Sequence, residues 1–467
     1  MSHLLQSFSG LRQPLQSWIP RLDARGFCVV VPVLLTATIS LVYLNGLVNT
    51  YKSRLASEAP QKSTGTEKKV RKFGEWTPVD FAYPPITACP QEPAESDPIP
   101  YRPFRSGEYH VTMGIRSMHW DEWIELDNQY EKYHRIREHR IRTRGPRVIR
   151  VLPDNPGIVG SGADAAIETI HELAEYLSRR FPTTFKVERH ASNQVSSQKG
   201  WGGAPPIKSI QIIPLRKSYD LPLDVNDGEN AATRAMELSA LLVQEDLALM
   251  IEGMDGRYYF QAGAICVPGF WRIQDKIGLP LDEIHTTGDV PRYKDKLQMS
   301  MERFFQRLAV DKPVARNNYF FQVVKSASPD AIEDIDPEEL AWAESSNGTE
   351  DAFSHTHPAH QPTRPTPTPS TVRLRTERQT LRRLPRTGAI LFTIRTYLTP
   401  IDELSKEPGV ARRLASALRG WGEDIGTYKG KFTGGWWDVV LDYLDKAADK
   451  EADRSGEDIR KMENYPF

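Results

Sequence analysis

The sequence has few cysteines, the residues whose disulfides stabilise small secreted domains and whose thiolates hold zinc and iron–sulfur clusters. It contains three cysteines, Cys28, Cys89 and Cys266, and no two of them have the C-x-x-C spacing of zinc or iron–sulfur sites. They fall in an apolar N-terminal run, a proline-rich segment and an expected strand, so they do not form a disulfide framework. This favours a folded part that faces a reducing compartment, and it argues against a metal held by cysteine clusters.

The sequence also lacks an excess of charge of one sign. Sixty Lys and Arg residues balance 61 Asp and Glu residues, which leaves a formal charge of -1. No global field therefore draws the protein to nucleic acid or to anionic lipid. The length of 467 residues and a hydrophobic content of 39% suffice for one large folded domain or two smaller ones.

One long uncharged run stands near the N-terminus. Residues 26–48, GFCVVVPVLLTATISLVYLNGLV, contain no charged side chain. As a helix, this run is long enough to cross a hydrocarbon core of roughly 30 Å. We expect a transmembrane anchor here, after a polar tail at 1–25. A cleaved signal peptide and a buried core helix are the alternatives, although a polar lead of about 25 residues is long for a signal peptide.

The orientation of such an anchor is undetermined. Within about 15 residues of the run, each side carries three basic residues, namely Arg12, Arg21 and Arg25 before it and Lys52, Arg54 and Lys62 after it. The sequon at Asn347 would indicate a lumenal domain only if it were glycosylated. Residues 49–105 are polar and rich in proline, which predicts a tether and an extended lead-in to the folded domain.

The pattern between residues 106 and 448 predicts an α+β fold. Apolar spacing indicates helices at about 121–141, capped by Asp121, and at 163–180, 410–421 and 436–448. Runs rich in β-branched and aromatic residues predict strands at 185–189, 207–214, 241–252, 257–267, 318–324 and 389–397. Met254-Asp255-Gly256 is a favourable hairpin connection. Central strands with helices at both ends favour an antiparallel sheet rather than alternating βαβ units.

Residues 325–371 interrupt this domain with an acidic half and a half rich in Pro, Thr and His. We expect a disordered surface insertion. His355, His357 and His360 could bind a metal, but a mobile tract offers no preorganised geometry. The last residues, 449–467, read as a charged tail.

Several stretches follow one another in order along about 270 residues. They are residues 113–115, 120–127, 243–247, 263–271, Ile284-His285 with Val290, Pro291 and Tyr293, residues 316–319, and residues 377–385. Together these stretches resemble the haem-dependent oxidative N-demethylase alpha-subunit family, in a fungal-type, membrane-anchored form.

The resemblance implies a PAS-like antiparallel sheet flanked by helices that binds haem b. Such a protein would use O₂ to oxidise an N-methyl amine and release formaldehyde. Flavin and iron–sulfur partner subunits would supply the electrons. This chain shows no G-x-G-x-x-G after a strand and no cysteine cluster, so a separate reductase is expected.

A haem iron needs a neutral axial base, and propionates need cationic or donor groups. His285, which follows the apolar residues Leu281 and Ile284, is our candidate for the metal ligand. A core or surface histidine without a ligand role is the alternative. Cys266 as a thiolate is disfavoured, because the apolar strand around it offers no donors.

The resemblance adds Arg378 and Gln379 as cofactor-binding candidates, with Tyr293 and Arg316 as weaker ones. The arginine strip of residues 373–386 could pair with propionates, dock an acidic reductase or form a solvated face. On strand alternation, Arg373, Arg375 and Glu377 share one face and Arg378 lies on the other. We expect Arg382 and Arg383 to be exposed. The strip is too short, and too poor in alternating aromatics, for nucleic acid.

Two functions other than catalysis stay open. A PAS-like haem domain can act as a gas or redox sensor, and the same fold without haem would be a small-molecule binding module. By analogy with haem enzymes that a reductase feeds, we expect a single-pass protein of an intracellular membrane, such as the endoplasmic reticulum.

Overall fold

The computed structural model describes residues 71–191, 199–325, 337–353 and 365–452. Within these ranges, no helix combines the length and apolarity that crossing a membrane requires. The predicted anchor at 26–48 lies outside them, as do the polar tail, the three clustered histidines and the chain after residue 452.

The central element is a seven-stranded sheet in the order β1-β8-β9-β10-β6-β7-β2. Every neighbouring pair in it is antiparallel. The strands are β1 (Arg116–Ser117), β2 (Ile149–Val151), β6 (Asp246–Glu252), β7 (Tyr258–Ala264), β8 (Val314–Val323), β9 (Val372–Arg383) and β10 (Ile390–Pro400). A second antiparallel sheet contains β3 (Phe185–Arg189), β4 (Ile207–Ile212) and β5 (Lys217–Asp220).

Strands β6 and β7 form the expected hairpin around Met254-Asp255-Gly256. Gly253 N donates to the carbonyl of Arg257 at 2.7 Å, and Gly256 has a φ of 82°, which a residue with a Cβ adopts less readily. The Asp255 carboxylate accepts from Arg257 N at 3.0 Å, closing the turn with a local side-chain bond.

Strand β6 is buried on both faces because the sheet lies between two layers. Leu247 and Leu249 belong to one hydrophobic cluster, whereas Ala248 and Met250 belong to another. Side chains of a strand alternate between its faces, so the uninterrupted apolar run of β6 fills both cores.

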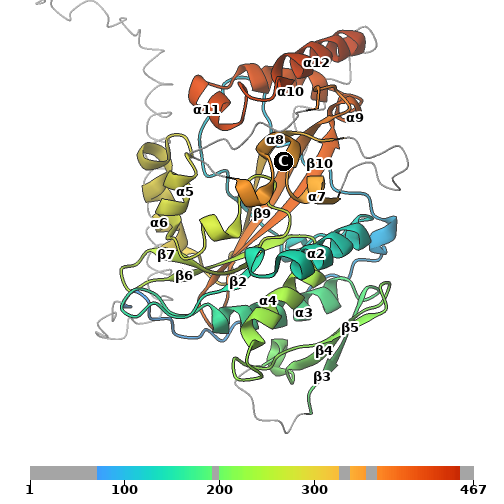
Figure 1. The fold of residues 1–467 in the computed structure, drawn as a ribbon. Coiled ribbons are helices and arrows are strands. Elements are labelled where there is room, and N and C mark those ends of the chain that lie inside the picture. The colour runs from blue at the N-terminus through green and yellow to red at the C-terminus, as the bar shows by residue number, and fades with distance from the viewer. Residues whose placement is uncertain (1–70, 192–198, 326–336, 354–364, 453–467) are drawn as a thin grey trace, which may run out of the picture. The chain divides into compact units, whose positions relative to one another are not determined.

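One face of the sheet is covered by α2 (Tyr130–Arg144), α3 (Ala163–Arg180) and α4 (Ala231–Leu242), with the small sheet beside them (Figure 1). The other face is covered by α5 (Leu281–Thr287), the π-helical turn η6 (Tyr293–Leu297) and α6 (Gln298–Arg307), which connect β7 to β8.

A third cluster joins the beginning of β9 and the end of β8 to the C-terminal helices. These are α9 (Ile401–Leu404), α10 (Val410–Arg419), α11 (Glu423–Tyr428) and α12 (Trp436–Ala452). Figure 1 shows α10 to α12 gathered at one end of the two longest strands, away from α3 and α4.

The helix predicted at 163–180 is confirmed as α3, and the antiparallel α+β architecture agrees with the sequence. Several elements differ, among them α2 and α4. Helix α2 begins at Tyr130, because a 3-10 turn at Trp120–Glu122 buries Trp120 and precedes a non-helical stretch. Helix α4 was not predicted, and its last turn was assigned to a strand, because the apolar run from Leu241 continues from the helix into β6.

Part of the segment interpreted as a disordered insertion is folded. Residues Pro337–Ala341 form α7, Glu344–Asn347 form α8 and Glu350–Ala352 form a 3-10 turn. Trp342 is 2% exposed, and Arg140 donates to the buried Glu350 at 2.9 Å. A hydrophobic anchor and a buried ion pair therefore hold the segment against the domain, which its polar composition did not indicate.

Candidate functional site

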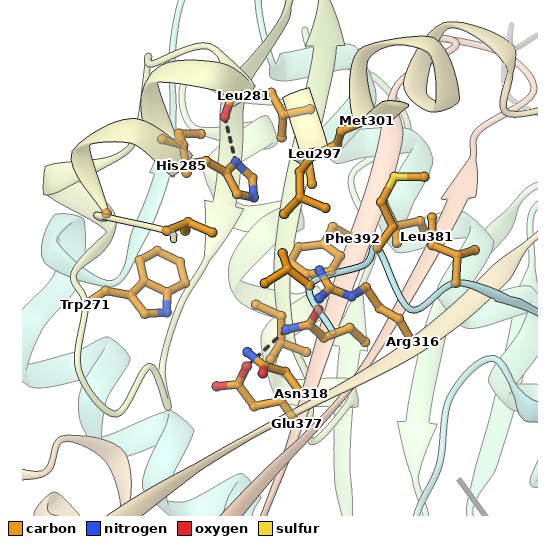
Figure 2. A pocket seen from close by; sticks show the side chains of 18 of the residues that line it. Trp271, Leu281, His285, Leu297, Met301, Arg316, Asn318, Glu377, Leu381 and Phe392 are labelled. Carbon is orange, nitrogen blue, oxygen red and sulfur yellow. Dashed lines mark hydrogen bonds between the residues drawn. The ribbon is translucent and has the colours of Figure 1, made fainter. Parts of the chain in front are cut away.

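A cavity of about 270 Å³ lies between the large sheet and the α5–α6 layer (Figure 2). Its helix wall includes Leu281, Ile284, Leu297 and Met301, and its sheet wall includes Phe392. Most of the lining is aliphatic or aromatic, with a few polar groups between them, which is typical of a small-molecule or cofactor pocket.

His285 lies on the helix wall with one ring nitrogen occupied. Its Nδ1 is 2.7 Å from the carbonyl of Leu281, one turn earlier in α5. A carbonyl only accepts, so Nδ1 carries the proton and the neutral ring keeps its lone pair on Nε2. Figure 2 shows this second nitrogen directed away from Leu281, toward the cavity. Burial lowers the pKa of His285 to about 4, so the ring is neutral at physiological pH.

The ring of Tyr293 packs against the face of the His285 imidazole. The two rings are stacked, with centroids 4.8 Å apart and an interplanar angle of 12°. Tyr293 is 3% exposed and does not belong to the cavity lining, and its hydroxyl has no hydrogen-bond partner within the described ranges. It is therefore placed to orient the imidazole rather than to touch a ligand.

The sheet wall carries a polar patch made by two neighbouring strands. In the register of β8 and β9, Arg316 opposes Gln379 and Asn318 opposes Glu377. Residues that oppose one another in an antiparallel pair project from the same face, so the four side chains reach the cavity together (Figure 2). Gln379 Nε2 donates to Glu377 Oε2 at 3.0 Å, and Arg375 Nε lies 3.3 Å from Glu377 Oε1.

Arg316 is half-buried, and its Nε has no hydrogen-bond partner in the part of the chain that the structure describes. Desolvation lowers the pKa of its guanidinium, but an arginine stays charged in proteins. Glu377 acts on this charge, but a cationic donor that faces a pocket without a hydrogen-bond partner can bind an anion.

Two lysines complete the charged lining. Lys429, which caps α11, is 4% exposed and donates to the carbonyl of Tyr319 at 2.6 Å and to Asn318 Oδ1 at 3.3 Å. Burial lowers its pKa to about 7. Lys276, which follows β7, lies 4.9 Å from the ring centroid of Trp271, and burial lowers its pKa as well. Neither lysine was predicted from the sequence as a pocket residue, because their positions in the pocket depend on tertiary packing.

Arg378 does not reach this cavity. It follows Glu377 in β9, so it projects from the opposite face, where its Nε pairs with Glu125 at 2.9 Å. It is 1% exposed and also donates to the carbonyl of Trp123. The structure thus places Arg378 and Gln379, which were predicted together, on different sides of the sheet.

The expectation that Arg382 and Arg383 are exposed is wrong. They are 0% and 2% exposed. Arg382 pairs with Glu172 of α3 at 2.7 Å, while Arg383 donates to the carbonyls of Leu308 and Gly388, both at 2.7 Å. Arg382 Nε and Nη1 have no hydrogen-bond partner in the described part of the chain, but the guanidinium lies over the rings of Trp123 and Trp120, at 4.4 and 4.9 Å from their centroids. Glu172 and Leu308 come from segments distant in sequence, so the burial of these two arginines depends on tertiary contacts.

Cys266, the rival metal ligand, is fully buried and does not line the cavity. Burial raises the pKa of its thiol to about 11, which keeps it protonated. A protonated thiol is a poor ligand for iron.

Fold and cavity together define an α+β protein with a partly open pocket that presents one neutral imidazole and several cations. The sequence matches the family model described as haem-dependent oxidative N-demethylase, alpha subunit-like, over residues 114–441. This match covers more than half of the chain, and the chain belongs to that family.

The family description implies dependence on haem, and the pocket residues fit that cofactor. The Nε2 of His285 has the free lone pair that an iron ligand needs, and its orientation is fixed through Nδ1. The apolar walls suit a flat hydrophobic ring, and the cations suit its carboxylates.

Proposed function

We propose that this protein is a haem b-dependent oxidoreductase that removes the methyl group of an N-methyl amine as formaldehyde, using O₂ and electrons from a separate reductase. The observation that carries the proposal is the imidazole of His285, whose Nδ1–H bond to Leu281 leaves Nε2 to face the cavity. The family match supplies the reaction class.

The overall reaction balances with two electrons from the reductase. An N–CH₃ group, O₂, two electrons and two protons give N–H, formaldehyde and water. When bound, haem supplies the site at which dioxygen is reduced and the methyl group is oxidised. In the chain itself, His285 would hold the iron, Tyr293 would orient that imidazole, and the apolar lining would surround the ring.

The remaining predicted cofactor residues divide by position. Gln379 and Arg316 line the cavity. Arg378 does not line it, and we assign to Arg378 a structural role through its ion pair with Glu125. Lys276, on the side of the cavity where β7 leads to α5, is a further candidate to pair with a propionate. Its charge acts on His285 and contributes to the lowered pKa of that ring.

The PAS-like fold is also part of the proposal. The five strands that follow α4 lie in the order β7-β6-β10-β9-β8, and the helices inserted between the second and third of them cover one face. This is the connectivity expected of a PAS-like sheet, in which the ligand lies between the sheet and those helices. Anchoring by residues 26–48, at an intracellular membrane such as the endoplasmic reticulum, is proposed from the uncharged run alone.

The test uses the full-length protein expressed with a supply of haem. Hydrogen peroxide replaces O₂ and the two electrons, so that no reductase is needed, and formaldehyde is measured with a panel of N-methyl amines. We expect formaldehyde from the wild type and little from His285→Ala. A haem-loaded protein that yields formaldehyde from none of the amines would contradict catalysis and favour a haem sensor.

A further inference from the structure

Four large apolar side chains are exposed at the end of the sheet where β6 turns into β7. They are Phe73, Val79, Ile158 and Met254, with exposed fractions of 49%, 44%, 40% and 62%. Single apolar side chains are common on protein surfaces, whereas a group of them in contact marks an interaction surface. None of the four lines the cavity. These four residues are termed the hairpin patch.

Three members of the hairpin patch meet around the β6–β7 turn. Met254 N donates to the carbonyl of Ile158 at 2.7 Å. The Phe73 ring lies against Gly256, where an added Cβ would meet ring carbons at 3.1 Å, and an added Cβ on Gly74 would meet Met254 at 3.2 Å. Three segments distant in sequence therefore place their exposed apolar side chains side by side.

The segment of residues 71–79 is fixed to this end of the sheet. Arg71 Nη2 donates to Glu252 Oε1, at the end of β6, at 2.8 Å. The indole of Trp76 and the backbone N–H of Val79 both donate to the carbonyl of Pro385, at 2.9 and 3.0 Å. Because these bonds hold the backbone at both turns, the exposed side chains of the segment stay directed outward.

A basic stretch leads into the hairpin patch. Residues 49–72 contain seven Lys and Arg residues and two Glu residues, a formal charge of +5, although the whole chain carries -1. The side chain of Lys72, the last of them, is 82% exposed. Glu75 lies 3.8 Å from Lys72, and Asp255 accepts from the hydroxyl of Tyr259 at 2.8 Å. Subtracting these two carboxylates still leaves +3, so the patch is bordered by positive charge.

We infer that the hairpin patch rests on the surface of a bilayer that contains anionic lipid. Its apolar side chains enter the interfacial region, and the basic stretch faces the lipid headgroups. Buried apolar area and nearby Lys and Arg residues are the two contributions that bind a protein surface to such a membrane. Neither contribution alone fits a bilayer as well as the two together do on this surface.

The place of the hairpin patch along the chain favours the bilayer over a soluble partner. The uncharged run of residues 26–48 is followed by 22 residues, 49–70, before Arg71. An anchor in that run would keep the patch close to the bilayer at a high effective concentration, so that a weak contact suffices. The inference goes beyond the proposed reaction and adds a second contact to the proposed anchor.

A second contact would orient the folded domain on the membrane. Ile390, at the beginning of β10, pairs with Met250 next to the hairpin, whereas Pro400, at its end, leads into α9. The hairpin patch and the helices α10 to α12 therefore lie at opposite ends of the long strands (Figure 1). With the patch on the bilayer, the C-terminal helices would point away from it.

The experiment is photolabelling of the full-length protein, reconstituted into vesicles of phosphatidylcholine and phosphatidylserine in a ratio of about 3:1. A carbene precursor on a phospholipid acyl chain labels the side chains that contact lipid, and tandem mass spectrometry locates them. We expect label at Phe73 and Met254 as well as in residues 26–48. We expect none at Phe432, which is 63% exposed and lies between α11 and α12. The measurement does not need haem, so its outcome is independent of the proposed reaction.

A double variant tests the apolar contribution. In Phe73→Ser with Met254→Ser, the label in the peptides of the hairpin patch should fall about 10-fold or more relative to the label in residues 26–48. Both side chains are exposed, so thermal unfolding should stay as in the wild type. Phe432→Ser is the matched control, because it removes an equally exposed apolar side chain at the other end of the domain, and it should leave the label unchanged.

A second set of substitutions tests the charge. Replacing Lys68, Lys69 and Lys72 together by Gln should lower the label in the hairpin patch about 10-fold in the vesicles with phosphatidylserine. Vesicles of phosphatidylcholine alone should give the wild type a similarly low label in the patch, while the label in residues 26–48 persists. A label that ignores both changes would contradict the role given to anionic lipid.

The distribution of label separates the possible outcomes. Label confined to residues 26–48 would overturn the inference and leave the proposed anchor intact. Label in the hairpin patch without label in residues 26–48 would support the inference and contradict the anchor. Label in neither would contradict both, and would favour a patch covered by another part of this chain or by a second copy. Equal label at Phe432 would show that lipid contact is not specific to the patch.

Discussion

The imidazole of His285 lies parallel to the phenol ring of Tyr293, with 4.8 Å between the ring centroids. The stack fixes the plane of the imidazole, and the bond from Nδ1 to the Leu281 carbonyl fixes its rotation. An imidazole restrained in both ways presents Nε2 in one direction, so the side chain of His285 loses less conformational entropy when a metal binds.

Variants of Tyr293 separate the ring from its hydroxyl. Tyr293→Phe keeps the stack and removes a buried hydroxyl that lacks a partner among the described residues, so the free energy of unfolding should stay the same or rise by about 1–3 kcal/mol. Tyr293→Ala leaves a cavity beside His285 and should lower the free energy of unfolding by about 3–5 kcal/mol. Denaturant unfolding measures both. A loss of stability in Tyr293→Phe would show that the hydroxyl is bonded after all.

Arg378→Met tests the structural role given to Arg378. Breaking its buried pair with Glu125 should lower the free energy of unfolding by about 3–5 kcal/mol, while each folded molecule keeps its haem. Arg419→Met is the control, because the pair of Arg419 with Asp445 is exposed and should contribute less than about 1 kcal/mol. If Arg378→Met lost haem while its free energy of unfolding stayed unchanged, Arg378 would be a cofactor-binding residue and the structural role would be contradicted.

The arginines of β9 show why the site was only partly predictable. Alternation along a strand correctly separates Arg378 from Glu377, and it could have identified Glu377 and Gln379 as partners on one face. It does not show which face meets the cavity, and it does not show the acceptors. Glu125 and Glu172 lie more than 200 residues from the arginines they bind. Charge alone therefore suggested exposure.

The fold was easier to predict where the pattern is regular. Helix α3 has an apolar stripe of clear helical period and was predicted over its full range, Ala163–Arg180. The run from Leu241 to Glu252 has no period that separates the end of α4 from β6, since both are buried all round. Lys429 reaches the pocket only because α11 packs against β8, a contact that local patterns do not encode.

Glu245 gives the protein a defined response to pH. Burial raises the pKa of its carboxyl from 4.5 to about 7, and its Oε2 has no partner in the described part of the chain. Between pH 4.5 and 7 the folded state keeps a proton that the unfolded state releases, so this residue's contribution to stability falls as pH rises through that window.

Glu245→Gln removes that titration. We expect the variant to be more stable than the wild type at pH 8 and about equally stable at pH 4.5, because a neutral amide carries no desolvation penalty. Thermal unfolding across this pH range measures the difference. A variant that is destabilised equally at both ends would mean that the ionised carboxylate is held by Arg395 and Arg378.

The central claim is that His285 holds a haem iron, and an absorption spectrum of the full-length protein tests it most directly. The wild type, His285→Ala and His119→Ala are expressed with haem supply, the last as a control because His119 is largely exposed and distant in sequence from α5. We predict a stoichiometric Soret band in the wild type and in His119→Ala, and its loss or shift in His285→Ala. A folded wild type that stays colourless and cannot be reconstituted with haem would contradict the account.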